Sequence, residues 1–211
     1  TSVSRGLGDV YKRQTHNYRY SPYRSQVKKL LMSGTIGTVK AITFYWHLDR
    51  IHGADYFRRW HRYKSNSGGL AVHKATHHFD LINWWIADIP VSAYATGDNH
   101  YYNPINAKRL GIKNLGERCK SCLSKNCSFR LELGTKDNLQ KLYSDNEHYD
   151  GYHRDQCVFD GSIEIEDMIR AEVRYSRGAV LNYGLVAFSP WEGYEISSVS
   201  YTHLRAHETQ R

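Results

Sequence analysis

Residues 67–80, with the sequence SGGLAVHKATHHFD, begin the helix around which the predicted fold is organised. The spacing of apolar residues predicts one helix from Leu70 to Ala87. At 3.6 residues per turn, His73, His77 and Asp80 fall on one face of that helix. The two glycines before it let its N-terminus approach a ligand closely, and the positive end of the helix dipole there would favour an anion.

Four titratable side chains make this helix a candidate catalytic site: His77, Lys74, His73 and Asp80. Histidine suits proton transfer near neutral pH, and an acidic neighbour such as Asp80 could fix the tautomer of the imidazole. Such clustering favours function over the alternative that these are core histidines. A zinc site using His73 and His77, spaced i and i+4, is a second functional alternative, although the glutamate of an HExxH helix is missing.

The elements around this helix follow from hydrophobic periodicity and from turn residues. Ser21 and Pro22 are typical of a helix start, and Gly34 of a helix end. The predicted elements are a helix from 22 to the stop at 34, a strand over 38–48, a loop over 49–67, a strand over 91–96, a short helix over 138–143 and a hairpin of strands over 167–175 and 179–188.

The order strand, helix, strand and hairpin predicts an α/β (α+β) domain with an open mixed, mostly antiparallel sheet and helices on one face. The second face of such a sheet needs cover, which a further copy of the chain could supply. The sheet is expected to be truncated. No GxGxxG motif with its flanking strand and helix occurs in the sequence, so no Rossmann domain is expected.

The domain boundaries follow from changes in sequence pattern along the chain. Residues 1–14 and 197–211 lack useful periodicity and look like non-native tails from cloning or adapter read-through, so they are left out of the fold prediction. Residues 15–196 are expected to form one domain. An irregular, cysteine-rich insertion occupies about 98–160 of it.

The insertion contains all the cysteines of the chain: Cys119, Cys122, Cys127 and Cys157. A CxxC pair with two further cysteines predicts a structural metal site, with zinc first and a [4Fe–4S] cluster as the alternative. Free thiols, or disulfides in an exported protein, are the remaining interpretations.

An aromatic and basic segment precedes the histidine helix, and Trp60 and His61 within it are candidate substrate-binding residues. Aromatic faces stack on sugar rings, and imidazoles hydrogen-bond hydroxyl groups. Because aromatic residues and arginine also mark protein interfaces, a packing role for the segment is equally consistent with the pattern.

Composition excludes several classes of protein. The chain is 40% hydrophobic, which supports a packed core, and no apolar stretch is long enough for a membrane span. The net charge of +8 is spread without a basic run or a nucleic-acid motif, so no nucleic-acid partner is expected. Without a secretory signal, the expected location is cytoplasmic.

The pattern Gly68-Gly69, His77 and Asp80 resembles the signature of the Gfo/Idh/MocA family of NAD(P)-dependent oxidoreductases. The segments 17–22, 34–39 and 175–179 are similar to parts of its C-terminal domain, and the resemblance covers nearly all of 15–196. Asn17 and Arg19, in the first of these segments, are therefore candidate substrate-binding residues.

The resemblance implies hydride transfer between a nicotinamide and a sugar or polyol carbon, with His77 as the acid/base. NAD or NADP would bind through a missing domain, so the fragment alone is expected to be inactive, and the sheet would mediate homo-oligomerisation. The family usually has an acid where this chain has His73, so the proton relay is expected to differ, with Lys74 or Asp80 contributing. A zinc-dependent lyase or hydrolase, and a non-catalytic sugar-binding or scaffold domain, are the alternative functions.

Overall fold

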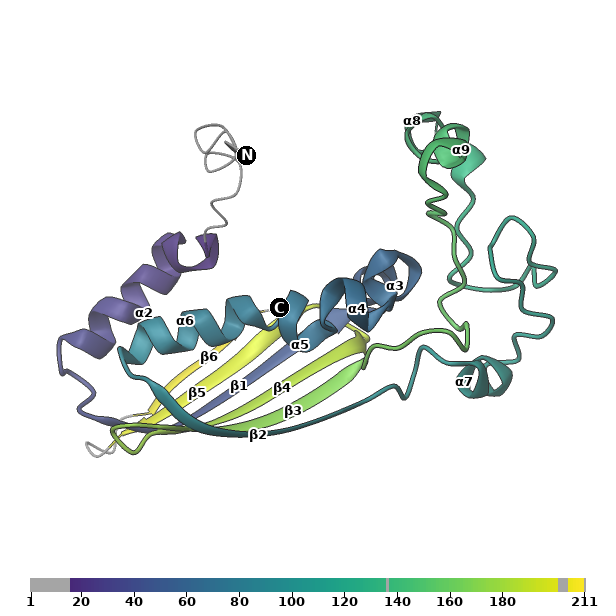
Figure 1. Cartoon of the computed structure of the whole chain (residues 1–211). Helices are drawn as coiled ribbons and strands as arrows, with labels where there is room; N and C mark the ends of the chain where they lie inside the picture. Colours follow the sequence, from purple (N-terminus) through teal and green to yellow (C-terminus); the bar gives the residue numbers. More distant parts are fainter. Residues whose placement is uncertain (1–15, 136, 201–204, 211) are drawn as a thin grey trace, which may run out of the picture.

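The computed structural model describes residues 16–135, 137–200 and 205–210, which form one sheet with helices over it and a long insertion (Figure 1). The predicted tail 1–14 lies outside the described residues. The helical elements are η1 (Asn17–Tyr20), α2 (Pro22–Met32), α3 (Arg50–Arg58), η2 (Trp60–Arg62), α4 (Lys64–Ser67), α5 (Leu70–His73), α6 (Thr76–Ile86), α7 (Pro104–Arg109), η3 (Leu133–Thr135), α8 (Asp137–Leu142), η4 (Ser144–Asn146) and α9 (Glu147–Asp150).

The strands form a single six-stranded sheet in the order β2-β3-β4-β1-β5-β6. Only β1 and β4 pair in parallel, and every other neighbouring pair is antiparallel, so the predicted mixed, mostly antiparallel sheet is confirmed. The strands are β1 (Val39–Asp49), β2 (Pro90–Asp98), β3 (Met168–Tyr175), β4 (Val180–Ser189), β5 (Gly193–Ser200) and β6 (Arg205–Gln210).

The end of the chain takes part in this sheet. β5 pairs with β1 as far as Ser200, and β6 pairs with β5 along the sheet edge. The strands therefore continue past residue 196, where the native domain was expected to end, while the non-native origin of residues 197–211 stays a prediction.

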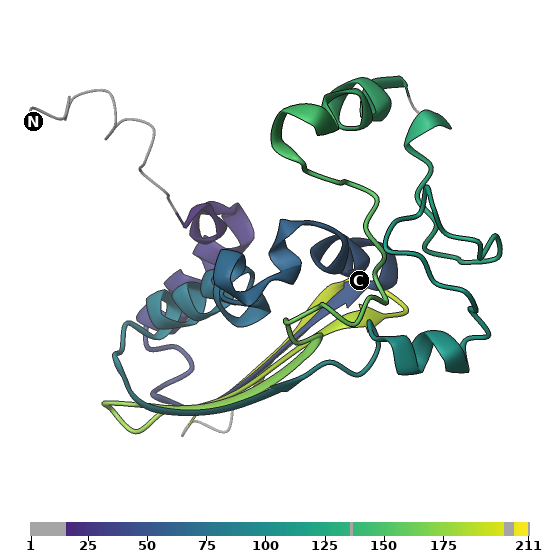
Figure 2. The same ribbon diagram turned by 45° about the vertical axis from the view of Figure 1, so that its right-hand side comes forward.

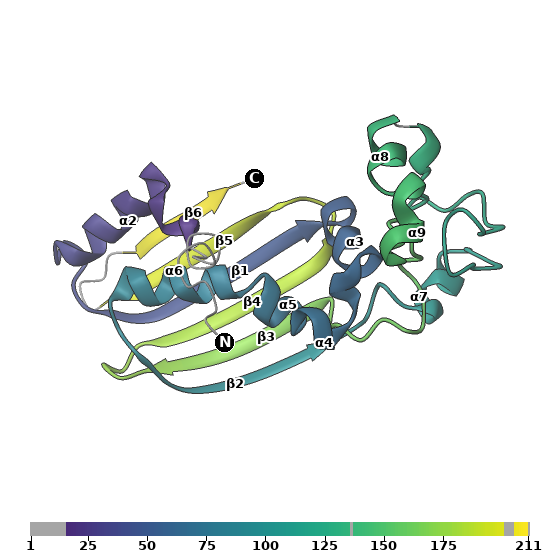
Figure 3. The same ribbon diagram turned by 45° about the horizontal axis from the view of Figure 1, so that its top comes forward.

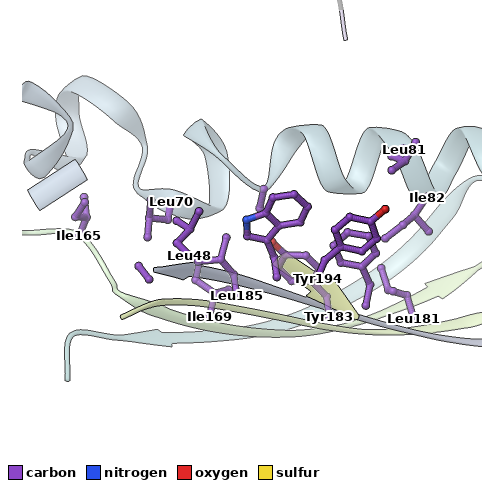
Figure 4. Packing of buried hydrophobic residues seen from close by; sticks show 14 of the residues in the cluster. Leu48, Leu70, Leu81, Ile82, Ile165, Ile169, Leu181, Tyr183, Leu185 and Tyr194 are labelled. Atoms are coloured by element: carbon purple, nitrogen blue, oxygen red, sulfur yellow. The ribbon is translucent and has the colours of Figure 1, made fainter. Parts of the chain in front are cut away.

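One face of the sheet is covered by α2 to α6, as Figure 3 shows from the helical side. In β1 the residues alternate as predicted, and Ile42, Phe44 and Trp46 are buried toward the helices. Leu81 and Ile82 of α6 belong to the same buried cluster and lie on the helical side of the sheet, above Leu181 and Tyr183 of β4 (Figure 4). The alternation arises because successive strand residues point to opposite faces, so the apolar half of the strand forms the core.

The opposite face of the sheet stays open in the described part of the chain. Every residue of the edge strand β2 is exposed, including Val91 at 64% and Tyr94 at 74%. A sheet with helices on one face only is confirmed, and its outer surface has a mixed polar and aromatic character.

The predicted helix from 22 to 34 is confirmed as α2. The Ser21 hydroxyl accepts a hydrogen bond from the backbone N–H of Arg24, and Pro22 occupies the first turn, where its missing N–H costs nothing. Beyond the end of the helix, Gly34 has a φ of +74°, which glycine adopts without strain.

The predicted loop over 49–67 is wrong, because this segment contains α3, η2 and α4. The Asp49 carboxylate caps α3 by accepting the backbone N–H groups of Ile51 and His52. Gly53 allows α3 to lie against β4, since a Cβ there would stand 1.8 Å from the carbonyl oxygen of Ala187. These helices are too short to give a clear hydrophobic periodicity, and the close packing of α3 at a glycine leaves no apolar signal in the sequence.

The predicted single helix from Leu70 to Ala87 is also wrong. The structure divides it into α5 and α6, with a break at Lys74 and Ala75 where both backbone N–H groups bond to the carbonyl of Leu70. The break turns the chain between the two helices, so His73 and His77 do not continue one helical face. Val72 of α5 is 60% exposed and lies outside the core.

The insertion extends beyond one end of the sheet (Figure 2). It contains the helices α7, α8 and α9. Of these, α8 confirms the short helix predicted near 138–143. In its described residues the β-structure is limited to an isolated bridge between Arg118 and Gln156. Most of the insertion backbone is therefore held by side chains rather than by a sheet.

Candidate functional site

A pocket of about 240 Å³ lies beside His73, between α3, η2 and α5. The His73 ring is 4.2 Å from that of His61, and it also contacts Tyr56 and Trp60 edge-on. Trp60 stacks on His61 at 3.9 Å. The structure thus brings together three predicted site residues, His73, Trp60 and His61, in one aromatic pocket. Its lining residues are His52, Asp55, Tyr56, Arg59, Trp60, His61 and His73.

The charges around this pocket are partly paired. Arg154 binds the Asp55 carboxylate with a shortest N–O distance of 2.8 Å, and His52 Nδ1 lies 2.7 Å from Glu192. Burial, with the positive fields of His73 and Arg59, lowers the pKa of His61 to about 4. His61 is therefore neutral at pH 7 and can hydrogen-bond a hydroxyl group.

His77 lies in a second group of rings next to the His73 pocket, near enough for its charge to contribute to lowering the pKa of His73. Its ring centroid is 5.5 Å from that of His16 and 6.2 Å from that of Tyr18. Its Nδ1 is buried without a hydrogen-bond partner among the described residues. Burial lowers the pKa of His77, and the charges of His16 and Lys74 add to this, against the opposing effect of Asp80. The imidazole is thus held in the neutral form that can accept a proton.

Asp80 does not hold the tautomer of His77 through a hydrogen bond. Both of its carboxylate oxygens bind the Arg19 guanidinium, with Arg19 Nε at 2.6 Å. This pair fastens η1 to α6, and it engages the arginine that was predicted to bind substrate. Asn17, the other predicted residue of that segment, is exposed on η1.

Lys74 lies at the break between α5 and α6, with its amine 5.2 Å from the centre of the Trp46 ring. Burial lowers the pKa of Lys74, and the carboxylate of Glu192 opposes that shift. Glu192 follows β4 and was not predicted from sequence, because only the folded sheet brings it near Lys74, Tyr18 and Tyr56. A half-buried amine with a lowered pKa releases its proton more readily than an exposed lysine does.

His78 is a core histidine, which was the alternative to a catalytic role for the histidines of this segment. It is 1% exposed, its Nδ1 lies 2.8 Å from the Tyr183 hydroxyl, and its ring stacks on Trp46 at 4.4 Å. Burial lowers its pKa well below the usual value. Neighbouring histidines of one helix therefore have different roles.

The N-terminus of α5 is not free to bind an anion, contrary to the expectation from the two glycines. The Glu166 carboxylate accepts the backbone N–H of Ala71 at 3.2 Å and lies within 3.5 Å of the Lys64 amine. A Cβ on Gly69 would stand 2.6 Å from the same carboxylate. Gly69 is therefore needed for a contact inside the protein rather than with a ligand.

The four cysteines lie near one another as free thiols around a small cavity. Burial raises the pKa of Cys157 to about 11, and it also raises that of Cys127. Within the described ranges, no group of three or more His, Cys, Asp or Glu side chains is arranged to hold a metal ion. The zinc and [4Fe–4S] predictions therefore find no preformed site, and neither does the zinc alternative at His73 and His77.

None of the helices in the described residues is long and apolar enough to cross a membrane.

The sequence matches the family described as "Oxidoreductase family, C-terminal alpha/beta domain" over residues 28–202. It is 37% identical over 189 residues to "Putative oxidoreductase YteT" of Bacillus subtilis (strain 168), covering 86% of this chain and 44% of that protein. The chain thus spans less than half the length of this curated relative.

Solved structures show the same fold at low identity. The myo-inositol 2-dehydrogenase of Lactobacillus plantarum matches with a TM-score of 0.54 and 17% identity over 92% of this chain and 40% of its own. GenD2 from gentamicin A biosynthesis, solved in complex with NAD, matches with a TM-score of 0.52 and 12% identity over 92% of this chain and 38% of its own. The chain therefore belongs to the Gfo/Idh/MocA family of oxidoreductases and carries its C-terminal α/β domain.

Proposed function

We propose that this chain is the substrate-side domain of an NAD(P)-dependent oxidoreductase that transfers hydride between a nicotinamide and the hydroxyl-bearing carbon of a sugar or polyol. His77 acts as the acid/base. The observation that carries this proposal is its half-buried imidazole, whose Nδ1 has no partner among the described residues and whose pKa is lowered by burial. Membership of the oxidoreductase family and the inositol dehydrogenase neighbour support it.

The proton leaves the substrate hydroxyl for His77 when the alcohol is oxidised, and it returns when the carbonyl is reduced. Lys74 stands three residues earlier at the helix break, with its pKa lowered by burial. It can donate a hydrogen bond to the same oxygen or share its proton. The carboxylate of Glu192 raises the pKa of Lys74 and so opposes the effect of burial. In this role it replaces the acid that the family usually has at the position of His73.

The pocket beside His73 receives the ring of the substrate. Trp60, 39% exposed, and Tyr56 offer aromatic faces to the C–H surface of a sugar. The neutral imidazoles of His61 and His73 hydrogen-bond its hydroxyl groups, since burial lowers the pKa of each. Asn17 remains a candidate for substrate contact because it is exposed, whereas Arg19 acts by positioning η1.

NAD or NADP, when bound, supplies hydride transfer, and a domain outside the described residues would hold its phosphates. The described residues could bind the substrate but offer no site for the phosphates of the nucleotide. The one Gly-Gly turn before a helix in the described chain is occupied by the Glu166 carboxylate, which would repel a phosphate. On this proposal the chain alone is inactive, and the reaction requires the longer protein, in the cytoplasm, where NAD(P) is available.

The open face of the sheet is the proposed surface for homo-oligomerisation. On this face Tyr94, which is 74% exposed, lines a pocket together with Tyr45, and a second copy could bury both side chains. A zinc-dependent lyase or hydrolase is disfavoured because the rings of His73 and His77 lie in separate groups. A non-catalytic sugar-binding domain is the remaining alternative.

The test is a comparison of His77→Asn with the unchanged enzyme in the full-length protein, using NAD⁺ or NADP⁺ and a panel of inositols and hexoses. We expect kcat to fall by about 10²–10⁴-fold with a smaller change in KM, because the proton acceptor is lost while the ring pocket remains. His148→Gln, an exposed histidine of the insertion, is the matched control. An unchanged kcat in His77→Asn would contradict the assignment, and absence of NAD(P)-linked turnover with every sugar would favour the binding-domain alternative.

A further inference from the structure

The four cysteines come from two distant parts of the insertion and line one cavity. Cys119, Cys122 and Cys127 lie on one irregular segment, and Cys157 lies on the later segment that leads back to the sheet. The bridge between Arg118 and Gln156 places the two segments side by side, with the Cys119 N–H bonded to Asp155 O and the Cys157 N–H bonded to Glu117 O, each at 2.8 Å. The backbone thus fixes the first and last cysteines of the set next to each other.

Hydrogen-bond donors point at the sulfur atoms of three of the four cysteines. The N–H of Leu131 lies 3.4 Å from Cys119 Sγ, and that of Phe159 lies 3.4 Å from Cys157 Sγ. Cys127 accepts the backbone N–H of Phe129 in the same way. Cys127 and Cys157 each receive the N–H of the residue two positions later. Such donors stabilise sulfur as an anion, which is the form that binds metal.

The cavity between these sulfurs suits one small cation. Its volume is about 20 Å³, close to the space that a single water-sized sphere occupies. Phe129, Val158 and Phe159 form apolar parts of its wall, and no carboxylate lines it. Soft thiolates with no oxygen ligand favour zinc over calcium or magnesium.

The positive charge around the cavity matches a tetrathiolate site. One Zn²⁺ with four thiolates carries about two net negative charges. Arg58 donates to Cys119 Sγ at 3.3 Å and is the main source of this charge, since Arg130 on the cavity wall, with its Nη1 bonded to Cys122 O, is paired with Glu132 at 2.8 Å. Arg58 is 5% exposed, so its charge is shielded little by water.

The segment around the first three cysteines has no regular secondary structure, and its apolar packing is limited to a few side chains such as Ile112, Leu115 and Phe129. Residues 111–132 contain no helix or strand, and Leu123, between Cys122 and Cys127, is 73% exposed. A segment with so little apolar packing is stabilised further when a metal links its ends, because the binding free energy becomes folding free energy.

We propose that Cys119, Cys122, Cys127 and Cys157 bind one structural zinc ion that fixes the insertion against α3. Cys119 and Cys157 are buried and set the position of the ion, whereas Cys122 and Cys127 are half-buried and turn inward on binding. The sulfurs then stand at about 2.3 Å from zinc in a tetrahedron. The site is structural because the cysteines would fill all four positions of the ion.

The experiment is elemental analysis of the chain purified under reducing conditions without chelator, followed by cobalt substitution. We expect close to one zinc per chain. After removal of zinc, added Co²⁺ should give a thiolate-to-cobalt charge-transfer band and the intense d–d bands of tetrahedral coordination. Cys122→Ser and Cys127→Ser, at the half-buried positions, should each lose most of the zinc and weaken the charge-transfer band. Leu123→Ser is the matched control in the same loop and should keep both.

Three results would overturn the proposal. The first is a chain with no stoichiometric zinc and no tetrahedral Co²⁺ spectrum. The second is an equal zinc content in Cys122→Ser and the unchanged chain. The third is iron with inorganic sulfide in place of zinc. If a serine variant misfolds, Co²⁺ titration of the unchanged, metal-free chain still decides the question, because the charge-transfer intensity reports the number of thiolate ligands.

Discussion

The sheet with its helices and the cysteine-rich insertion are stabilised in different ways. In the sheet, Phe44, Leu181 and Leu185 are fully buried, and the strands pair along most of their length. Where the insertion meets the helical layer, buried arginines supply many of the contacts, as with Arg62 of η2, which is 1% exposed and bonds Gln156 Oε1 of the insertion at 2.6 Å. Apolar burial is non-directional, whereas such polar contacts fix particular partners.

This difference shows where each part of the molecule is sensitive. A sheet held by apolar contacts loses free energy of unfolding in proportion to the volume removed from its core. An insertion held by a few hydrogen bonds, ion pairs and the proposed zinc depends on single side chains. The predictions below test that contrast, beginning with the largest expected effect.

Leu185→Ala should destabilise the whole domain by about 2–5 kcal/mol. Leu185 is fully buried in β4, where it pairs with Trp46 on one side and Ile169 on the other, so the substitution leaves a cavity in the middle of the sheet. Denaturant unfolding followed by circular dichroism measures the change. Leu123→Ala in the insertion, at a leucine that is 73% exposed, should change the unfolding free energy by less than about 0.5 kcal/mol. Equal changes in unfolding free energy for the two substitutions would contradict the proposed difference between the sheet and the insertion.

Asp167→Ala should destabilise the junction between the two regions by about 3 kcal/mol. The buried Asp167 carboxylate accepts the backbone N–H groups of His100, Tyr101 and Tyr102 at 2.6–2.9 Å, where the chain leaves the sheet. Without it, those donors lose their acceptor. Hydrogen exchange should show faster exchange at residues 100–102 than in β4.

Asp98→Ala is the control for Asp167→Ala, because it lies across the same junction with a side chain that is 71% exposed. It should leave exchange at 100–102 almost unchanged. Similar exchange in the two variants would mean that backbone contacts alone hold the junction.

Much of the sheet could be predicted from sequence because its signals are local. The alternation of Ile42, Phe44 and Trp46 predicts β1, and Ser21 with Pro22 predicts the start of α2, and the structure confirms both. The break between α5 and α6 could not be predicted, since the apolar spacing continues through Lys74 and Ala75. α3 was missed because its contact at Gly53 depends on β4, far away in the chain.

The candidate site could likewise be predicted where its signals are local and not where they depend on distant residues. The sequence pattern pointed to His77, Lys74, His73, Trp60 and His61 as residues of a site, and the structure groups three of them in one pocket. The partners that tune them could not be predicted: Arg19 takes the carboxylate of Asp80, and Glu192 reaches Lys74 from the turn after β4. These contacts are long-range, and a single sequence contains no local pattern for them.

Stability should fall as the pH falls from about 6.5 to 4, and His61 should contribute to this. Burial lowers the pKa of His61 to about 4 in the folded chain, whereas the unfolded value is near 6.5. Between these values only the unfolded state binds the proton, so folding loses up to about 3 kcal/mol as the pH falls, and the contribution is fully present above pH 6.5.

His61→Gln should therefore flatten the dependence of the unfolding free energy on pH between 4 and 6.5. Urea unfolding at a series of pH values measures it. His148→Gln, at an exposed histidine of the insertion, should leave the slope unchanged. A slope that is the same in all three proteins would show that His61 titrates normally.

The smallest effect is expected for the ion pair that joins the insertion to the helical layer. Arg154 binds both oxygens of Asp55 on α3 at 2.8 and 2.9 Å, and Asp55 is partly exposed, so the pair should contribute about 0.5–1 kcal/mol and less at high salt. A double-mutant cycle of Arg154→Gln and Asp55→Asn measures the coupling energy. The more exposed pair of Arg174 and Glu172 on β3 is the control and should give a coupling near zero. Coupling that is absent in the first pair would mean that the insertion is held against α3 by other contacts, among them those of Arg58 with Phe129 and of Tyr102 with Phe57 and Arg50.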